Sequence, residues 1–402
     1  MKTVGGIYVH IPFCESKCGY CAFNSRPLLP DPREGATGAV AGGMPGMTPP
    51  VVPQEYVNAL LTDMERESTA WADAGLESIY FGGGTPSLLS PRQLEGILDA
   101  LHSRFRIEKG AEVTIECNPG SIDPARARAY RDLGVNRISV GVQSMCESEL
   151  SALGRRHDAE DAVAALETAR SAGFDSVSAD IMLGIPGQSP ESLRLTLERL
   201  AGLVDHVSAY LLSLEPGTEF WRLAGLGRLE LPGESLVMRL YEQAHRDLGG
   251  EGFTRYEVSN WSRPGFECRH NLMYWRRGQY AGIGAGAHSH RDGIRYSKAE
   301  NPGDYIALLR RGADPVEMRE RLTGDQILIE EVMLGLRTER GLDLAVLTGA
   351  DRIDRRRMDA AIANLVGDGL LARNGNNLKL SPNGVKVCDS VTESISMSVL
   401  SR

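Results

Sequence analysis

Long hydrophobic runs are missing from this 402-residue sequence. A membrane-spanning helix needs about 20 consecutive apolar residues, and no stretch approaches that length. The start of the sequence, residues 1–6, also lacks a charged region followed by a long apolar run, the pattern of a secretory signal peptide. We therefore expect no transmembrane segment and a cytoplasmic location, with peripheral attachment at the inner face of the membrane as the alternative.

An excess of basic charge is also missing, because 44 Lys and Arg residues face 53 Asp and Glu residues, a formal net charge of −9. Such a chain has no overall positive field to attract nucleic acid or anionic lipid. Cysteine is scarce, with seven residues at positions 14, 18, 21, 117, 146, 268 and 388. An odd number of cysteines, three of them within residues 14–21, is a poor disulfide framework and favours a metal site.

What is present is an alternation of short apolar runs and helical patterns. Strands are predicted at 6–11, 78–81, 112–116, 137–142, 177–183 and 207–214, with helices at 54–74, 91–105, 124–133, 159–172 and 190–203. Six such units predict an α/β fold, a partial (β/α)6 barrel over residues 1–225. Chemistry in such a barrel belongs at the C-terminal ends of the strands.

Two further regions follow the barrel. Residues 226–310 read as a barrel extension rich in aromatic residues, glycine and histidine, and residues 311–402 as a small domain. Helices at 325–337 and 354–368, then a hairpin at 370–373 and 378–380, predict a winged-helix-like α+β fold. Such domains often bind DNA, but residues 323–402 hold 10 Lys and Arg against 11 Asp and Glu, a net charge of −1. We therefore expect no nucleic-acid partner.

The segment 28–53 is rich in proline, glycine and alanine. This composition buries little apolar surface and predicts a flexible insertion. A neutral surface loop and a lid over the site are the two interpretations.

The strongest motif is C-x3-C-x2-C, formed by Cys14, Cys18 and Cys21 directly after the first predicted strand. Iron–sulfur clusters are held by thiolates, usually four. No fourth cysteine follows, since position 23 is Phe, so three ligands would leave one iron of a [4Fe–4S] cluster open to a small molecule. The alternatives are chance clustering and a zinc site, although zinc usually takes C-x2-C pairs from two loops.

This spacing after the first barrel strand resembles the radical S-adenosylmethionine (SAM) superfamily, in which SAM binds the open iron. A glycine-rich run, Gly83, Gly84 and Thr85, ends the second predicted strand, where that family has backbone in contact with SAM. Glycine there permits close backbone approach.

Within the superfamily, nearly the whole chain resembles the oxygen-independent coproporphyrinogen III oxidase group. The resemblance implies a SAM-binding set of Tyr8, Tyr20, Glu116, Gln143, Arg155 and Asp180. Arg155 would pair with the SAM carboxylate through its forked guanidinium, and Asp180 would accept hydrogen bonds from the ribose hydroxyls. Taken singly, each residue also reads as a surface or helix-cap residue.

Two departures set the chain apart from the oxidases of this group. Phe23 replaces a further cysteine, and Cys14 lies closer to the start of the sequence. The signature H-N-x-x-Y-W, with His270, Asn271, Tyr274 and Trp275, instead resembles the heme-chaperone branch of the group.

A neutral imidazole is a common axial ligand of heme iron. The residues alone favour a hydrogen-bonded core histidine at His270, and the six-residue signature shifts the preference to the heme ligand. Cys268 is the alternative thiolate ligand, and His288 and His290 are weaker candidates. The glycines beside that histidine pair indicate close approach to a neighbour, which a neighbouring strand would satisfy.

The resemblance implies a heme chaperone with a [4Fe–4S] cluster, SAM and heme as cargo. Its partners would be heme-acceptor proteins, respiratory and membrane-associated, and the cluster would control a homodimer. The enzymatic alternative is oxygen-independent coproporphyrinogen III oxidase in porphyrin biosynthesis, so catalytic residues stay unassigned. A radical SAM enzyme acting on nucleic acid would rest on the small domain alone.

Overall fold

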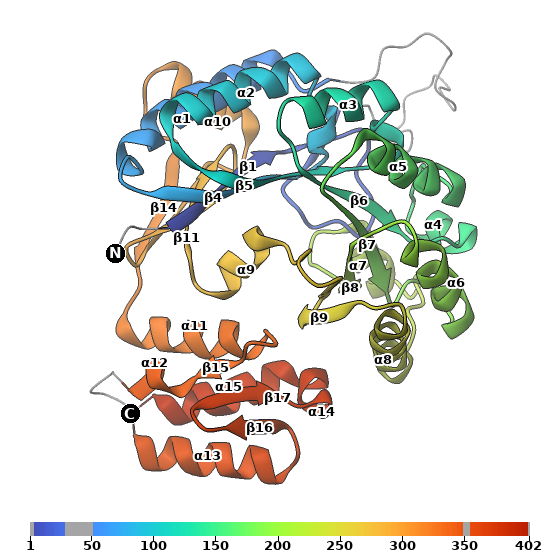
Figure 1. The fold of residues 1–402 in the computed structure, drawn as a ribbon, viewed down its shortest axis with the longest axis vertical. Helices are drawn as coiled ribbons and strands as arrows, with labels where there is room; N and C mark the ends of the chain where they lie inside the picture. The colour runs from blue at the N-terminus through green and yellow to red at the C-terminus, as the bar shows by residue number, and fades with distance from the viewer. Residues whose placement is uncertain (1–3, 29–50, 349–353, 401–402) are drawn as a thin grey trace.

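The computed structural model describes residues 4–28, 51–348 and 354–400. A 12-stranded sheet organises the larger part, in the order β14-β13-β12-β11-β1-β4-β5-β6-β7-β8-β10-β9. Its centre contains the six predicted parallel strands, β1 (Val4–Ile11), β4 (Gly75–Gly83), β5 (Arg106–Cys117), β6 (Arg137–Gln143), β7 (Ser176–Leu183) and β8 (His206–Leu211). The predicted α/β partial barrel is confirmed, and Figure 1 shows its helices on the outer face.

The helices between these strands are α1 (Gln54–Ala70), α2 (Pro91–Arg104), α3 (Pro124–Asp132), α4 (Glu147–Ala152), α5 (Ala159–Ala172) and α6 (Pro190–Ala201), with 3-10 turns at Pro86–Leu88 and Pro119–Ser121. The five predicted helices begin where the sequence predicts and end within four residues of the predicted ends, and the short helix α4 was not predicted. Ser90 and Gln93 form a capping box around Pro91 at the start of α2. Gly173 ends α5 in the left-handed conformation, with φ of 81°.

Alternation along the strands separates an apolar outer face from a polar inner face. In β1, Ile7, Val9 and Ile11 are fully buried in the core beneath the helices, whereas Tyr8 and His10 alternate with them. The other parallel strands follow the same pattern, so the concave face collects the polar side chains that the sequence places at alternate positions.

Both edges of the sheet extend beyond the predicted strands. At one edge β11 (Gln279–Ile283) pairs in parallel with β1, followed by antiparallel β12 (His288–Arg291), β13 (Ile294–Lys298) and β14 (Val316–Arg321), with α10 (Pro302–Arg310) between β13 and β14. At the other edge lie β9 (Thr254–Glu257) and β10 (Asn260–Ser262), preceded by α7 (Glu219–Gly225) and α8 (Glu234–Gly250).

The glycines of this extension accommodate neighbouring chain. A Cβ at Gly282 would collide with the backbone of His288, and one at Gly284 would lie 2.8 Å from the hydroxyl of Tyr56. The close approach that these glycines predict is therefore made to neighbouring strand and helix.

The C-terminal part has its own hydrophobic core. It contains α11 (Gly324–Leu336), β15 (Leu342–Asp343), α12 (Leu344–Thr348), α13 (Arg355–Gly367), β16 (Leu371–Asn374), β17 (Asn377–Leu380), α14 (Pro382–Lys386) and α15 (Cys388–Val399). Val332, Ile362 and Ile395 meet in this core. Because β14 belongs to the large sheet, we propose that the domain begins near residue 322, later than the predicted 311.

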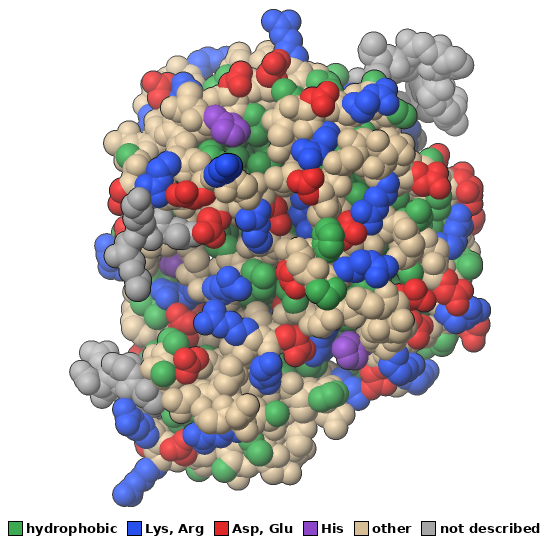
Figure 2. Space-filling model, viewed as in Figure 1, with side chains coloured by type: hydrophobic (Ala, Val, Ile, Leu, Met, Phe, Trp, Pro, Cys, Tyr) green, Lys and Arg blue, Asp and Glu red, His purple; other side chains and the backbone are tan. Residues whose placement is uncertain are grey.

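The surface charge, the expected absence of a membrane-spanning helix and the 28–53 insertion can each be compared with the structure. Figure 2 shows Lys and Arg side chains interspersed with Asp and Glu over the viewed face. In the described ranges, none of the helices has the length and apolar character to cross a bilayer. Most of the predicted 28–53 insertion, residues 29–50, lies outside the described residues.

Candidate cluster and cofactor site

The three motif cysteines lie in one loop that leaves the C-terminal end of β1. Short parallel strands β2 (Phe13–Cys14) and β3 (Arg26–Pro27) close this loop, and the Cys21 amide donates to the Cys18 carbonyl at 3.1 Å. All three are half-buried free thiols. Burial raises the pKa of the Cys14 and Cys21 thiols.

The glycine-rich end of β4 packs directly against this loop. The amide of Gly84 donates to the Ile11 carbonyl at 2.9 Å, and that of Thr85 to the Phe13 carbonyl at 2.7 Å. A Cβ at Gly84 would stand 2.5 Å from the Phe13 carbonyl oxygen, and Gly83 has φ of 113°. Only glycine suits this close approach and this backbone conformation.

Arg155 reaches from the loop after α4 toward the cysteines. Its Nη1 lies 3.6 Å from the Cys18 sulfur, and its Nη2 donates to Asn118 Oδ1 at 2.7 Å and to the Gly141 carbonyl at 2.8 Å. Its Nε is buried and has no hydrogen-bond partner among the described residues. A buried N–H without an acceptor is costly, so this guanidinium is arranged to receive an anionic group.

Asn118 is a residue that the sequence analysis missed. Its Nδ2 donates to the Thr85 hydroxyl at 3.0 Å while its Oδ1 accepts from Arg155. The amide thus joins the glycine-rich turn to the arginine and orients both. Its position directly after β5, at the same strand end as Glu116, was the available signal.

Two carboxylates line the concave face beside these groups. Tyr80 donates to Glu116 Oε1 at 2.7 Å, and the Gly83 amide donates to Oε2 at 3.2 Å. Burial, reinforced by the nearby Asp180 charge, raises the pKa of Glu116 to about 7. Asp180 accepts from the Ser139 hydroxyl at 3.0 Å, and burial raises its pKa as well.

Three further predicted residues complete this end of the barrel. Gln143 has φ of 68°, a left-handed conformation that is uncommon outside glycine and is often found at functional sites. The Tyr8 hydroxyl donates to His10 Nδ1 at 2.9 Å, since His10 Nε2 donates to the Asn24 carbonyl. Tyr20 packs edge-on against Phe220 of α7, with ring centroids 6.0 Å apart.

The H-N-x-x-Y-W residues lie elsewhere, on the short helix α9 (Arg269–Trp275). His270 is 1% exposed, and its ring stacks on Tyr80 with centroids 5.1 Å apart. Its Nδ1 is hydrogen-bonded to the Ser78 hydroxyl at 2.8 Å and its Nε2 to the Tyr274 hydroxyl at 3.0 Å. Burial lowers the pKa of His270 to about 3, so the ring is neutral.

Glu112 anchors the first turn of α9. Its carboxylate accepts from the amides of Arg269 and His270, at 3.1 and 3.0 Å, and from the Cys268 thiol at 3.4 Å. Burial raises the pKa of Cys268 to about 12, so this sulfur is a neutral thiol. The structure therefore brings the cysteine loop together with the residues that the resemblance implies for SAM binding, but it separates α9 from the cysteines. Ser78, which bonds His270, lies four residues before Gly82 in β4, a distance of about 13 Å along the strand. The glycine turn that packs against the cysteine loop begins only after Gly82.

Comparison with known proteins gives matches over both parts of the chain. The radical SAM superfamily model matches residues 8–200, and the HemN C-terminal domain model matches residues 322–387. The heme chaperone HemW of Mycobacterium tuberculosis is 37% identical over 392 residues, covering 97% of this chain and 94% of that protein. The heme chaperone HemW of Bacillus subtilis is 33% identical, covering 83% and 84%.

The chain belongs to the HemW family. Its fold is shared with the solved coproporphyrinogen III oxidase HemN of Escherichia coli, a radical SAM enzyme, at a TM-score of 0.81. That alignment covers 98% of this chain and 90% of HemN at 22% identity, a likeness of fold. In this HemW-family chain Phe23 is 70% exposed on the cysteine loop.

Proposed function

We propose that Cys14, Cys18 and Cys21 hold a [4Fe–4S] cluster whose fourth iron is open to SAM. Three half-buried thiols on one loop are a soft donor set suited to iron–sulfur chemistry. When bound and reduced, such a cluster supplies an electron to SAM. The support is the radical SAM family match together with the packing of the glycine turn against this loop.

The surrounding residues would bind and orient SAM. Arg155, with its partnerless Nε, would receive the SAM carboxylate, and Gly83, Gly84 and Thr85 would offer backbone on the other side of the loop. Asp180 would accept from the ribose hydroxyls.

Glu116 and Gln143 would complete the polar shell around the cofactor. Tyr8, hydrogen-bonded to His10, and Tyr20, packed on Phe220, would border it.

We infer that the protein is a heme chaperone, which binds heme and transfers it to acceptor proteins. The observation that carries this is the signature helix α9, whose His270 stacks on Tyr80, the same tyrosine that donates to Glu116. One side chain thus touches both the proposed SAM shell and the proposed heme-binding segment of His270, Asn271, Tyr274 and Trp275. The cluster and SAM would regulate binding or release of heme through this contact.

An anaerobic heme titration of the cluster-reconstituted protein, followed at the Soret band, tests this function. Saturable stoichiometric binding, and transfer of the bound heme to an apo-acceptor, is the expected result. Absence of specific binding, with decarboxylation of coproporphyrinogen III under reducing conditions with SAM, would establish the oxidase instead.

The acceptors and assembly state follow as proposals from the same function. We expect acceptors among heme-requiring respiratory proteins at the membrane, with this chain in the cytoplasm or peripherally attached. Gel filtration with and without the reconstituted cluster tests the proposed cluster-dependent homodimer. An elution volume independent of the cluster would contradict it.

A further inference from the structure

Each cysteine of the loop lies close to a contact with another part of the chain. The carbonyl directly before Cys14 accepts from the glycine turn of β4 at 2.7 Å, and the carbonyl of Gly19, directly after Cys18, accepts from α7 at 2.9 Å. Both of these contacts join backbone groups. The contact that follows Cys21 is different, because the side chain of Asn24 makes it. This third contact can therefore be removed by substitution.

Asn24 joins the cysteine loop to the barrel extension. Its Nδ2 donates to the Glu300 carbonyl at 2.9 Å and, over a longer distance of 3.4 Å, to the Ala285 carbonyl. Its own carbonyl accepts from His10 Nε2 at 2.8 Å. One residue thus connects the loop both to the end of β1 and to the turn between β11 and β12, which we call the 284–287 turn.

The 284–287 turn is shaped to receive the amide of Asn24. Gly286 has φ of 73°, and a Cβ at this position would lie 2.4 Å from Asn24 Nδ2. A side chain there would both strain the backbone and displace Asn24. The glycine-rich run that predicts close approach to a neighbour therefore has the cysteine loop among its neighbours.

Buried side chains support the 284–287 turn from the barrel side. The Ala285 amide donates to the Tyr56 hydroxyl at 2.9 Å, and the Gly284 amide donates to Asp63 Oδ2 at 3.1 Å. Asp63 is itself buried and pairs with buried Lys298 at 2.7 Å. Because these partners lie in the core, the turn is a rigid support for the loop that packs on it.

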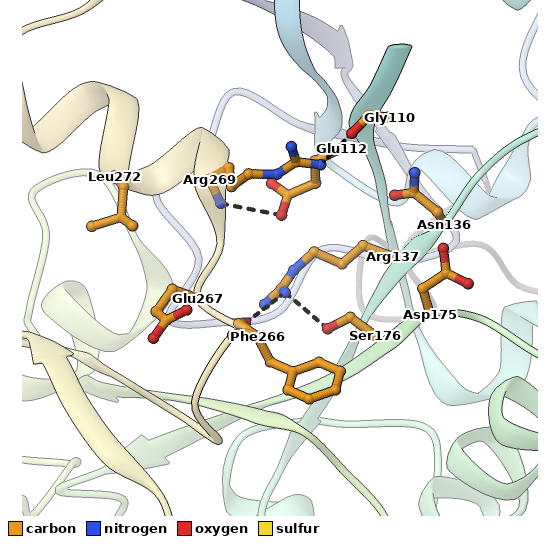
Figure 3. A pocket seen from close by; sticks show the side chains of 11 residues that line it. Gly110, Glu112, Asn136, Arg137, Asp175, Ser176, Phe266, Glu267, Arg269 and Leu272 are labelled. Carbon is orange, nitrogen blue, oxygen red and sulfur yellow. Dashed lines mark hydrogen bonds between the residues drawn. The ribbon is translucent and has the colours of Figure 1, made fainter.

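The same run of chain carries the H-N-x-x-Y-W helix. The start of α9 is held by the Glu112 carboxylate, which accepts from the Arg269 amide (Figure 3). After α9 the chain forms β11, which pairs in parallel with β1 and leads into the 284–287 turn. The signature helix and the support of the cysteine loop therefore belong to one continuous segment, residues 269–287.

We propose that Asn24 is a positioning residue for the cluster, which holds the part of the loop after Cys21 against the 284–287 turn. Loss of this contact frees the chain between Cys21 and β3, so solvent and oxygen reach the cluster more easily. The inference rests on the proposed cluster. It adds that a turn 261 positions further along the chain controls how firmly the cluster is retained.

The rate of cluster loss in air, followed by the visible absorbance of the reconstituted full chain, tests this role. Asn24→Ala should lose the cluster about fivefold faster than the unaltered protein, the scale of one neutral hydrogen bond. Asn24→Asp keeps the size of the side chain but has no N–H to donate, so it should lose the cluster at least as fast. Unchanged rates in both variants would overturn the inference.

Two glycines of the extension give a matched pair of variants. Gly286 and Gly293 have φ of 73° and 72°, but among the described residues nothing lies within 4 Å of a Cβ at Gly293. Gly286→Ala should therefore lose the cluster at least fivefold faster than Gly293→Ala, although both substitutions strain the backbone alike. Once Asn24→Ala has removed the collision, the two alanines should have equal effects. A difference that persists there would contradict the proposed contact.

The midpoint potential of the cluster separates positioning from a general loss of stability. Solvent stabilises the more negatively charged reduced cluster, so the potential should rise in Asn24→Ala and Gly286→Ala and stay unchanged in Gly293→Ala. If the unaltered protein holds no cluster after reconstitution, the proposed function itself fails. If it holds one whose potential and rate of loss are the same in every variant, the function stands and the role of Asn24 is refuted.

Discussion

Replacing His270 with glutamine should make the barrel less sensitive to acid. His270 is buried and neutral, with its pKa lowered to about 3 by burial, whereas an unfolded histidine has a pKa of about 6.5. Below pH 6.5 the unfolded chain therefore binds a proton that the folded chain does not, so the stability that His270 contributes falls as the pH drops from 6.5 toward 3. Glutamine does not titrate in this range, so the variant does not lose this part of its stability.

The size of the effect follows from the two pKa values. One pKa unit corresponds to about 1.4 kcal/mol, so at pH 5 the penalty is about 2 kcal/mol, and at pH 7 it is about 0.2 kcal/mol. The other buried histidines, such as His157 and His206, keep their contributions in both proteins. The loss of unfolding free energy between pH 7 and pH 5 should therefore shrink by about 2 kcal/mol in His270→Gln.

Urea unfolding of the cluster-free protein measures this difference. The four tryptophans, Trp71, Trp221, Trp261 and Trp275, all precede the C-terminal domain, so their fluorescence follows unfolding of the barrel part. Tyr274→Phe is the control, because it removes the 3.0 Å hydrogen bond to His270 without removing a titrating ring. It should lower stability at both pH values and keep the acid response.

An equal acid response in His270→Gln and the unaltered protein would refute the reasoning. It would mean that His270 is protonated as readily in the folded chain as in the unfolded one, and so that its ring nitrogens are accessible. That result would favour His270 as an iron ligand over a buried, hydrogen-bonded core histidine.

Three other expectations concern the cluster and SAM. Cys18→Ala should abolish the visible charge-transfer absorbance of the reconstituted protein, and full iron and sulfide content in this variant would contradict the cluster assignment. Asp180→Ala and Asn118→Ala should each keep the cluster and weaken SAM binding about tenfold, which is the scale of one hydrogen bond to a charged group. Isothermal titration calorimetry measures this affinity, and an unchanged value would remove the residue from the site. Because the pKa of Glu116 is about 7, its carboxylate ionises as the pH rises through 7, so affinity for cationic SAM should rise over that range and lose this dependence in Glu116→Gln.

The secondary structure could be predicted from the sequence because its signals are local. Alternating and helical periodicities, proline at helix starts and the glycine after α5 each act within a few residues. The sequence therefore predicts the six central strands and the helices between them. The edge strands β11–β14 were harder to predict, since these short segments acquire strand structure only by pairing with one another and with β1.

The sequence by itself determined which chemical groups the chain carries and where along it they stand. Three cysteines in one loop, the glycine turn and the H-N-x-x-Y-W signature are contiguous patterns, and contiguity keeps such residues together in any fold. Only the tertiary structure decided what those groups face. Ser78 and His270 are 192 positions apart, and their contact occupies a ring nitrogen that the sequence left available for iron. The position of Asn118 between Thr85 and Arg155 likewise depends on the packing of distant segments, which no local pattern encodes.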